Sequence, residues 1–373
     1  MEQKVIYNGQ ILTLTHFWAT GEPCLWITDP QQIGMPKMEF VGGYPNEYCI
    51  FLKNLTETEL AQITSLDGAP LDVREELRQF LTGKDNPMAL QDKKIMPPPW
   101  LAHREIERYS IGWRMGYGED YIYRFGDWLD TLSPEERTEY RSLFPEPVTW
   151  KGWWDDEDSG EVLEHGDFWV DAWQPEGQPK YTRQWLQQEF AAGRKRELCL
   201  FWGHQPSEDG QLTKSCLSQW WMEDFWSIAD TYLCMEQYMM AGKAALFSDQ
   251  EIRKEILACS DPKQIKALGR KVRGFDQKVW DRFKYAIVLN GNWCKFSQNR
   301  DLREFLLSTG DSVLVEASPY DNIWGIRLAA SSPEAQDPMK WRGQNLLGFA
   351  LMEVRDELRR VTQNEMLCDW NAV

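Results

Sequence analysis

The first sixty residues alternate short apolar runs with turn residues. Runs rich in β-branched and aromatic side chains occupy positions 4–7, 11–15 and 48–52, and Gly or Pro residues separate them. Short runs of this composition, bounded by turn residues, are typical of β-strands. The pattern therefore predicts a small sheet at the N-terminus.

Apolar positions change their spacing in the C-terminal part. From residue 198 onward they recur mostly every three or four residues, which places side chains on one face of a helix. Ser248, Asp261 and Asp276 stand where such stretches begin, and their side chains are of the type that caps a helix N-terminus. Segments 199–203 and 312–317 have the pattern of strands. We expect a mainly α-helical C-terminal domain.

The domain organisation follows from this change and from chain length. A chain of 373 residues exceeds the usual length of one domain, and the composition becomes linker-like at residues 175–180. We therefore predict an α+β protein with an acidic, Trp-rich α+β domain at 1–195, a mainly helical domain at 196–361 and a tail at 362–373.

Composition and charge limit the classes of function that the chain can have. The chain is 42% hydrophobic and 27% charged, and it contains no apolar run near the roughly 18 residues that span a bilayer. With no signal pattern at the N-terminus, we expect a cytoplasmic protein without a membrane partner. Up to and including Arg196 the chain carries 20 basic and 33 acidic residues, so this part holds −13 of the net charge of −17. Such a charge disfavours nonspecific nucleic-acid binding there. The acidic run at 155–161 is a candidate surface for a basic protein partner or a cation, and a solvated acidic loop is the alternative interpretation.

Cysteine and histidine spacing argues against a metal centre. The eight cysteines include no two within fifteen residues of each other, and the four histidines are equally dispersed. Zinc sites and redox motifs need ligands a few residues apart. We expect reduced thiols, no protein-held metal and no cofactor.

Residues 235–244, MEQYMMAGKA, place an acid and a base among apolar side chains. On a helix, Glu236, Met240 and Lys243 share one face, because residues three, four and seven apart lie on the same side. The carboxylate and the ammonium then face one apolar-walled space. A partly buried helix with one ordinary ion pair is the alternative interpretation.

Five motifs, in this order, resemble the NADAR (YbiA-like) family over about residues 198–360. They are LSQWW, MEQYMMAGKA, ALGRKVRGFDQKVWDRFKYAIV, KFSQNRDLREFLLSTGDSVLVEASPYDNIWGI and GQNLLGFALMEVRDEL. The resemblance implies an N-glycosidase that cuts the bond between ribose C1 and a nitrogen. It implies as substrate either guanine-linked ADP-ribose on nucleic acid or nucleotides, or a phosphorylated riboflavin-biosynthesis intermediate. Residues 1–195 match no family that we recognise.

The resemblance places the family's functional Glu, Trp and Asp at Glu236, Trp280 and Asp321. Breaking a ribosyl C–N bond builds positive charge on the sugar, which a carboxylate stabilises, so we expect Glu236 and Asp321 to be catalytic. Trp280 then stacks on the flat leaving group, and we expect five further residues to contact the substrate: Lys243, Trp220, Trp324, Arg327 and Asn345.

Each assignment has a structural alternative. Trp280 has the spacing of a core residue, Asp321 suits a turn, and Lys243 can simply neutralise Glu236. Two positions depart from the family pattern. The family commonly has Ser-Asn-Phe/Tyr where this chain has Ser-Gln219-Trp. It often has Trp-Gly-x-Gly where this chain has Trp-Gly-Ile-Arg327. For the whole chain, the alternatives are a non-catalytic module that senses ADP-ribose or a nucleotide, with an acidic partner-binding domain, and a DNA-mimicking inhibitor.

Overall fold

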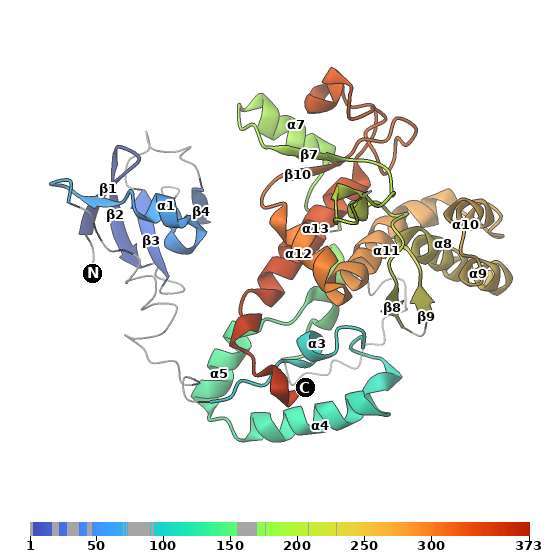
Figure 1. Ribbon diagram of the computed structural model, residues 1–373, viewed down its shortest axis with the longest axis horizontal. Helices are drawn as coiled ribbons and strands as arrows, with labels where there is room; N and C mark the ends of the chain where they lie inside the picture. Colours follow the sequence, from blue (N-terminus) through green and yellow to red (C-terminus); the bar gives the residue numbers. More distant parts are fainter. Residues whose placement is uncertain are drawn as a thin grey trace. The chain divides into compact units, whose positions relative to one another are not determined.

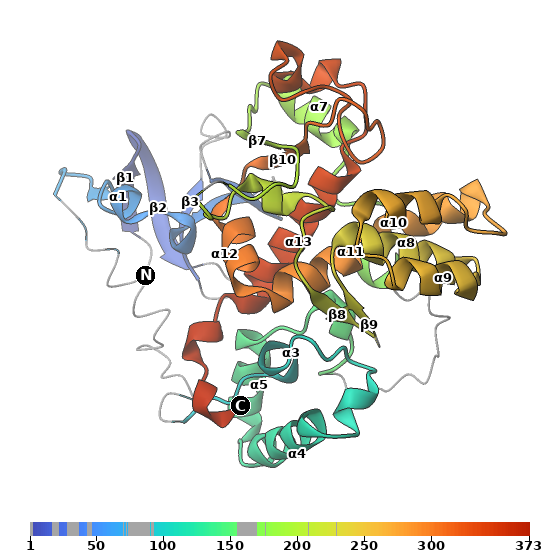
Figure 2. The same cartoon turned by 45° about the vertical axis from the view of Figure 1, so that its right-hand side comes forward.

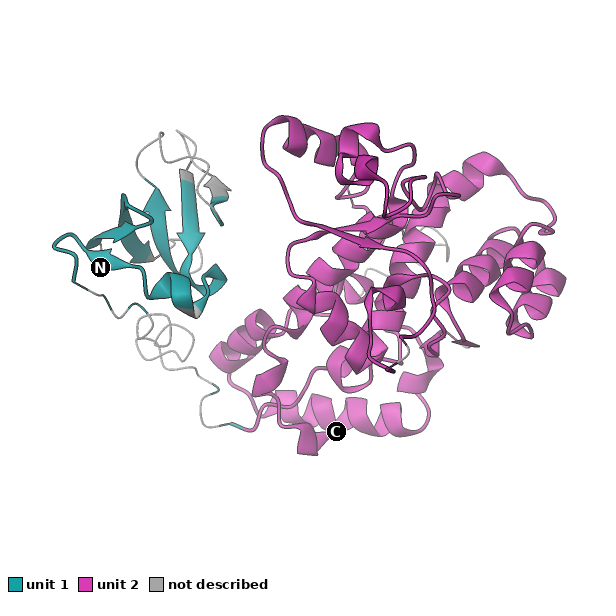
Figure 3. Cartoon of the chain, turned by 45° about the horizontal axis from the view of Figure 1, so that its top comes forward, with its two compact units in different colours: residues 1–93 teal, residues 94–373 magenta. Residues whose placement is uncertain are grey.

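The computed structural model divides into two compact units, Met1–Lys93 and Lys94–Val373 (Figure 3). It describes residues 3–16, 22–27, 37–42, 47–69, 71, 73, 90, 93–154, 170–175, 177–207, 209–228 and 230–373. The acidic run at 155–161 lies outside these residues. The domain boundary expected near residue 195 falls inside the second unit.

The first unit is built on the predicted N-terminal sheet, which is antiparallel with the strand order β4-β5-β3-β2-β1-β6. Asn8 and Gly9 connect the first two strands, and both have positive φ angles, as a two-residue hairpin turn requires. The elements are β1 (Gln3–Tyr7), β2 (Gln10–His16), β3 (Pro23–Ile27), β4 (Glu39–Gly42), β5 (Glu47–Phe51), α1 (Glu57–Leu60) and β6 (Thr64–Ser65).

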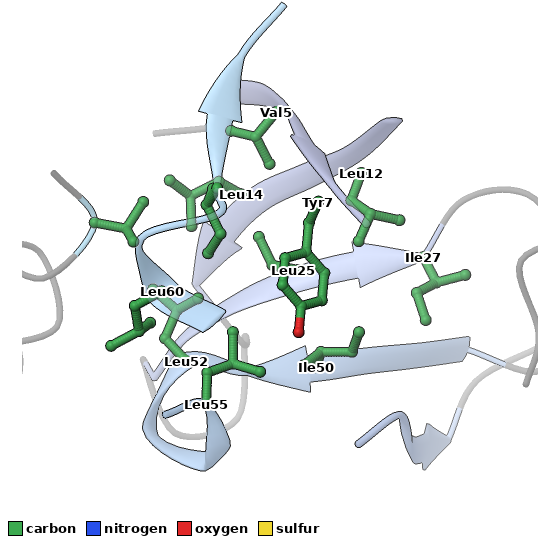
Figure 4. Close-up of a cluster of buried hydrophobic side chains, with 12 residues drawn as sticks. Val5, Tyr7, Leu12, Leu14, Leu25, Ile27, Ile50, Leu52, Leu55 and Leu60 are labelled. Atoms are coloured by element: carbon green, nitrogen blue, oxygen red, sulfur yellow. The ribbon is translucent and has the colours of Figure 1, made fainter. Parts of the chain in front are cut away.

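One face of this sheet carries the apolar core of the first unit (Figure 4). Val5 and Tyr7 alternate along β1, and Leu12 and Leu14 alternate along β2, so all four side chains point to the same side. Leu52, which follows β5, lies among them together with the residues around α1. None of the predicted site residues belongs to this unit.

The second unit is organised around α11 (Gln277–Gln298), which packs against α8 (Met235–Leu246) and α13 (Leu346–Thr362) (Figures 1 and 2). Two helices, α9 (Gln250–Leu257) and α10 (Pro262–Gly269), pack on α8. The predicted mainly α-helical C-terminal region is confirmed. The remaining elements are α3 (Pro99–Ala102), α4 (Tyr117–Asp130), α5 (Pro134–Leu143), α7 (Arg183–Ala191), β7 (Leu198–Phe201), β8 (Phe225–Ser227), β9 (Asp230–Tyr232), α12 (Arg300–Ser308) and β10 (Val313–Glu316).

Helix caps follow the sequence with one exception. The side chain of Asp261 accepts from the Gln264 N–H at 2.8 Å, and that of Asp276 accepts from the Val279 N–H at 2.9 Å. The predicted cap at Ser248 is wrong, because Asp249 occupies the N-cap position of α9. The carboxylate of Asp249 also forms an ion pair with the Arg273 side chain, which the local sequence motif does not predict.

Two parallel strands, β7 and β10, pair in register in the second unit, with Leu198 opposite Val313 and Phe201 opposite Glu316. Parallel strands have their carboxyl ends at the same edge. The segments after Phe201 and after Glu316 therefore emerge side by side. These two connections form part of the candidate site.

Described residues between 94 and 195 pack onto the helices that follow. The Ser227 hydroxyl donates to the partly buried Glu107 carboxylate at 2.8 Å, and the Val148 N–H donates to Glu357 at 2.7 Å. These contacts explain why residues 94–195 belong to the same compact unit as the helices. Within the described part of the chain, no helix is long and apolar enough to cross a membrane.

Candidate functional site

A cavity of about 610 Å³ lies between α8, α10, the first turn of α11 and the connections after β7 and β10. Six of the eight predicted site residues line it, and two, Arg327 and Asn345, do not. The six are Glu236, Lys243, Trp280, Asp321, Trp220 and Trp324. Residues 104 positions apart in sequence, from 220 to 324, thus meet at one cavity.

Glu236 lies in the first turn of α8, and its side chain is only 3% exposed. Its N–H donates to the Gln219 carbonyl at 2.8 Å, which joins the start of the helix to the preceding loop. Carboxylate atom Oε1 is buried without a hydrogen-bond partner among the described residues. An unsatisfied buried acceptor is costly, so this oxygen is available to a ligand.

Burial raises the pKa of Glu236 to about 7, because the charged form loses its hydration. Lys266 and a hydrogen bond from the Trp220 side chain act in the opposite direction, whereas the negative charge of Asp321 adds to the increase. Near neutral pH this group is therefore poised between acid and base forms, as a proton-transferring residue needs to be.

A third carboxyl group, that of Glu316, lines the same cavity. It ends β10, and its Oε2 atom is buried without a hydrogen-bond partner among the described residues. Burial, with repulsion from Asp321 and Glu236, raises the pKa of Glu316 to about 8. The Gln219 Oε1 atom, also at the cavity, is a further buried acceptor without a donor in the described part of the chain.

Asp321 shapes the loop after β10. Its Oδ1 atom accepts the N–H groups of Ile323 and Trp324, both at 2.8 Å, which is the geometry of an Asx turn. The turn interpretation of this residue and its place at the cavity are therefore compatible. The same hydrogen bonds hold Trp324 at the cavity wall.

Asn345 and Arg327 are placed elsewhere. Asn345 is fully buried at the start of α13, where its side chain accepts from the Glu316 N–H and donates to the Leu314 carbonyl, both at 2.9 Å. It therefore fixes the strand that carries Glu316. Arg327 is exposed, with a left-handed φ of 53°, and does not line the cavity.

The cationic side of the cavity comes mainly from α10. Lys266 and Arg270 are four residues apart, so they share one helix face, and both lower the pKa of Glu236. Lys243 instead donates to the Gly269 carbonyl at 2.9 Å and lies 5.7 Å from the ring centroid of Trp280. Lys266, rather than Lys243, is thus the main cation that acts on Glu236.

Aromatic side chains line the cavity from its wall to its mouth. Trp280 and Trp220 are partly buried, and the Trp220 ring lies 5.7 Å from the Lys266 ammonium. Trp202 is 55% exposed, Tyr320 is 85% exposed, and their ring centroids are 6.4 Å apart. Exposed aromatic faces of this kind suit a planar ring of a ligand.

Among the charged residues that line this cavity, sequence reasoning missed three: Glu316, Lys266 and Arg270. The acid that ends an apolar strand at 313–316 was a signal for the first, because strand ends often present polar groups at a ligand site. The four-residue spacing of Lys266 and Arg270 was a signal for the other two. Neither pattern identifies a site without knowledge of which helix packs beside α8.

The arrangement combines three carboxyl groups, a set of cations and flat aromatic walls in one cavity. Carboxyl groups that hold different protonation states can act as acid and base at the same pH. Lysine and arginine side chains suit a phosphate, and indole rings suit a planar base. The chemistry that fits is cleavage of a polar, anionic substrate with a flat leaving group.

Comparison with known proteins shows what this region of the chain is similar to. The NADAR domain model matches residues 200–359. N-glycosidase R617 of Acanthamoeba polyphaga mimivirus is 52% identical over 126 residues, which are 34% of this chain and 74% of that protein. Protein irg-1 of Caenorhabditis elegans is 41% identical over 129 residues, covering 34% of this chain and 61% of that protein. N-glycosidase YbiA of Escherichia coli K12 is 32% identical over 128 residues, with 34% and 71% covered.

A solved structure, the NMR structure of the E. coli protein YbiA, also aligns with the chain. Its TM-score is 0.36 at 27% identity, and the alignment covers 44% of this chain and 86% of that one. The residues that the NADAR domain model matches, 200–359, include every cavity-lining residue from Trp202 to Trp324. By its domain match and its similarity to relatives of which it covers most of the length, the chain belongs to the NADAR-domain family.

Proposed function

We propose that this protein is an N-glycosidase that hydrolyses a ribosyl C1–N bond in the cavity around Glu236. The observation that carries the proposal is the buried Glu236 carboxyl group, which has an unpartnered oxygen among the described residues and a pKa raised to about 7. Relatives that bear the name N-glycosidase share this region of the chain and support the same activity.

In the proposed reaction, the C1–N bond breaks and its electron pair stays on the leaving nitrogen. The Glu236 carboxylate stabilises the positive charge on the ribosyl ring and takes a proton from the water that adds to C1. Glu316, with a pKa of about 8, is mostly protonated at neutral pH and gives its proton to the departing base. Asp321 adds negative charge beside the ring and holds Trp324 in place. Proton transfer through water then restores Glu316, so the net reaction consumes one water molecule.

For the substrate, we propose guanine-linked ADP-ribose ahead of a phosphorylated riboflavin-biosynthesis intermediate. Lys266, Arg270 and Lys243 provide phosphate contacts that suit either compound. The exposed pair Trp202 and Tyr320 at the cavity mouth favours a substrate with a second planar ring, which the ADP-ribosyl adduct has in its adenine. Trp280 is proposed to stack on the leaving base.

The test is a direct comparison of the two substrates. Purified protein is incubated with guanine-ADP-ribosylated DNA and, separately, with the phosphorylated riboflavin intermediates, and released base and sugar are measured by mass spectrometry. We expect turnover that Glu236→Gln abolishes while the circular dichroism spectrum stays unchanged. Tight nucleotide binding in calorimetry without turnover over hours would overturn the proposal and leave a sensing module in its place.

A further inference from the structure

Lys295 is a fully buried lysine that does not line the cavity. It lies on α11, is 0% exposed, and its ammonium donates to the backbone carbonyls of Cys216 at 2.7 Å and Ser218 at 3.2 Å. A buried ammonium group is costly, and charge-assisted hydrogen bonds to carbonyls offset that cost. Burial also lowers the pKa of Lys295 to about 8. Both hydrogen bonds that this ammonium donates within the described residues therefore end on one loop.

That loop, residues 216–220, also contacts Glu236. The Ser218 hydroxyl accepts from the Trp220 N–H at 3.2 Å, so the segment held by Lys295 also orients the next residues. The Gln219 carbonyl accepts the N–H of Glu236 at 2.8 Å. The Trp220 side chain, in turn, donates to the Glu236 carboxylate and lowers its pKa.

We propose that Lys295 is a positioning residue, whose ammonium fixes the 216–220 loop so that Gln219 and Trp220 hold Glu236 in its reactive orientation. The inference rests on the proposed function, in which Glu236 is the reacting carboxylate. A lysine suits this task because its compact ammonium reaches two carbonyls, those of Cys216 and Ser218, from a helix. Methionine keeps the length and the apolar stem but donates no hydrogen bond.

The matched control is Arg303→Met. Arg303 is also a buried cation, 8% exposed, and it donates to a backbone carbonyl, that of Ser297, at 2.9 Å. It lies on α12 and does not line the cavity, and the described hydrogen bonds and ion pair of its side chain go to Ser297 and Glu365 rather than to the 216–220 loop. Both variants remove a buried positive charge from a carbonyl, so a general loss of stability affects both.

The experiment measures the pKa of Glu236 in the full-length protein, from the δ-carbon signal of ¹³C-labelled glutamate assigned by Glu236→Gln. In Lys295→Met we expect this pKa to rise by about half a unit or more, because the bond from Trp220 is weakened. We expect kcat to fall about tenfold or more with KM changed less than threefold, and the acidic limb of the pH profile to move upward. Arg303→Met should lower the melting temperature and leave the pKa of Glu236 and kcat unchanged.

An unchanged pKa of Glu236 and unchanged kcat in folded Lys295→Met would overturn the proposal. If that variant does not fold, Trp220→Phe decides, since it keeps a ring but removes the N–H donor. A rise of the Glu236 pKa in Trp220→Phe supports the link, and an unchanged value refutes it. The labelling measurement needs no turnover, so absence of glycosidase activity in the wild type counts against the proposed function alone.

Discussion

Replacing Glu236 by glutamine should stabilise the protein while abolishing its activity. The side chain is almost fully buried, and burial raises its pKa from 4.5 to about 7. An increase of about 2.5 units corresponds to about 3 kcal/mol of cost for the charged form in the fold, at about 1.4 kcal/mol per unit. Glutamine keeps the shape without that charge. At a pH above 7, Glu236→Gln should therefore be more stable than wild type by about 3 kcal/mol or somewhat less.

The pH dependence has a definite sign. Because the folded pKa is raised, the folded state binds the proton more tightly, and stability falls as pH rises from 4.5 through about 7. At about pH 5.5 only about 1.4 kcal/mol of the cost is present, so the advantage of the variant should grow by about 2 kcal/mol between about pH 5.5 and about pH 8.5. Glu316 titrates in both proteins, but its pKa is lower in Glu236→Gln because the repulsion from Glu236 is absent, and this difference adds to the advantage of the variant at high pH.

The assay is urea unfolding of both full-length proteins, followed by tryptophan fluorescence at the two pH values. Glu255→Gln, which replaces an exposed carboxylate on α9, serves as the control and should leave stability unchanged at both. Turnover of Glu236→Gln should fall on the order of a hundredfold or more, with little change in substrate binding. A variant no more stable than wild type at about pH 8.5, or an advantage equal at both pH values, would refute the reasoning.

Four further predictions concern the same cavity. Trp280→Ala should raise KM about tenfold with a smaller effect on kcat, measured by initial rates, because it removes a stacking surface; an effect on kcat alone would contradict this role. Lys266→Met should raise the pKa of Glu236 and move the acidic limb of the pH–rate profile to higher pH, since Lys266 is the main charge that lowers that pKa; an acidic limb at the same pH would exclude this electrostatic effect. Gly269→Ala should destabilise the fold by about 1–3 kcal/mol in thermal unfolding, because its Cβ would come within 2.0 Å of the Met240 sulfur and 2.8 Å of the Met240 Cγ, so that side chain must shift; unchanged stability would contradict this packing cost. Activity should persist in a chelator, as expected for carboxyl-group catalysis, and loss restored by a divalent ion would show that a metal takes part.

The NADAR motifs allowed six cavity residues to be predicted, since each lies within a local pattern that can be read without a fold. Glu236 and Lys243 are seven residues apart on one helix, and helical periodicity alone puts them on one face. Trp280 and Asp321 came from the resemblance, and tertiary packing brings them to the same cavity. Their catalytic and binding roles stay predictions.

Asn345 shows where sequence reasoning reaches its limit. A polar residue at the start of a helix suits a ligand or a structural contact equally well, and only the position of β10 decides between them. The same applies to Lys243, whose ammonium donates a hydrogen bond to the Gly269 carbonyl rather than to Glu236.

By itself, the sequence determined the local elements: strand alternation, helix faces and most caps depend on neighbouring residues and on backbone geometry. Only the tertiary structure decided which side chains lose water together. The raised pKa values of Glu236 and Glu316, and the buried contact between Lys295 and the 216–220 loop, arise from segments up to 85 residues apart that pack into one low-dielectric interior. Burial of this kind is a property of the assembled core, because desolvation depends on every element that covers a group, and no single stretch of sequence contains that information.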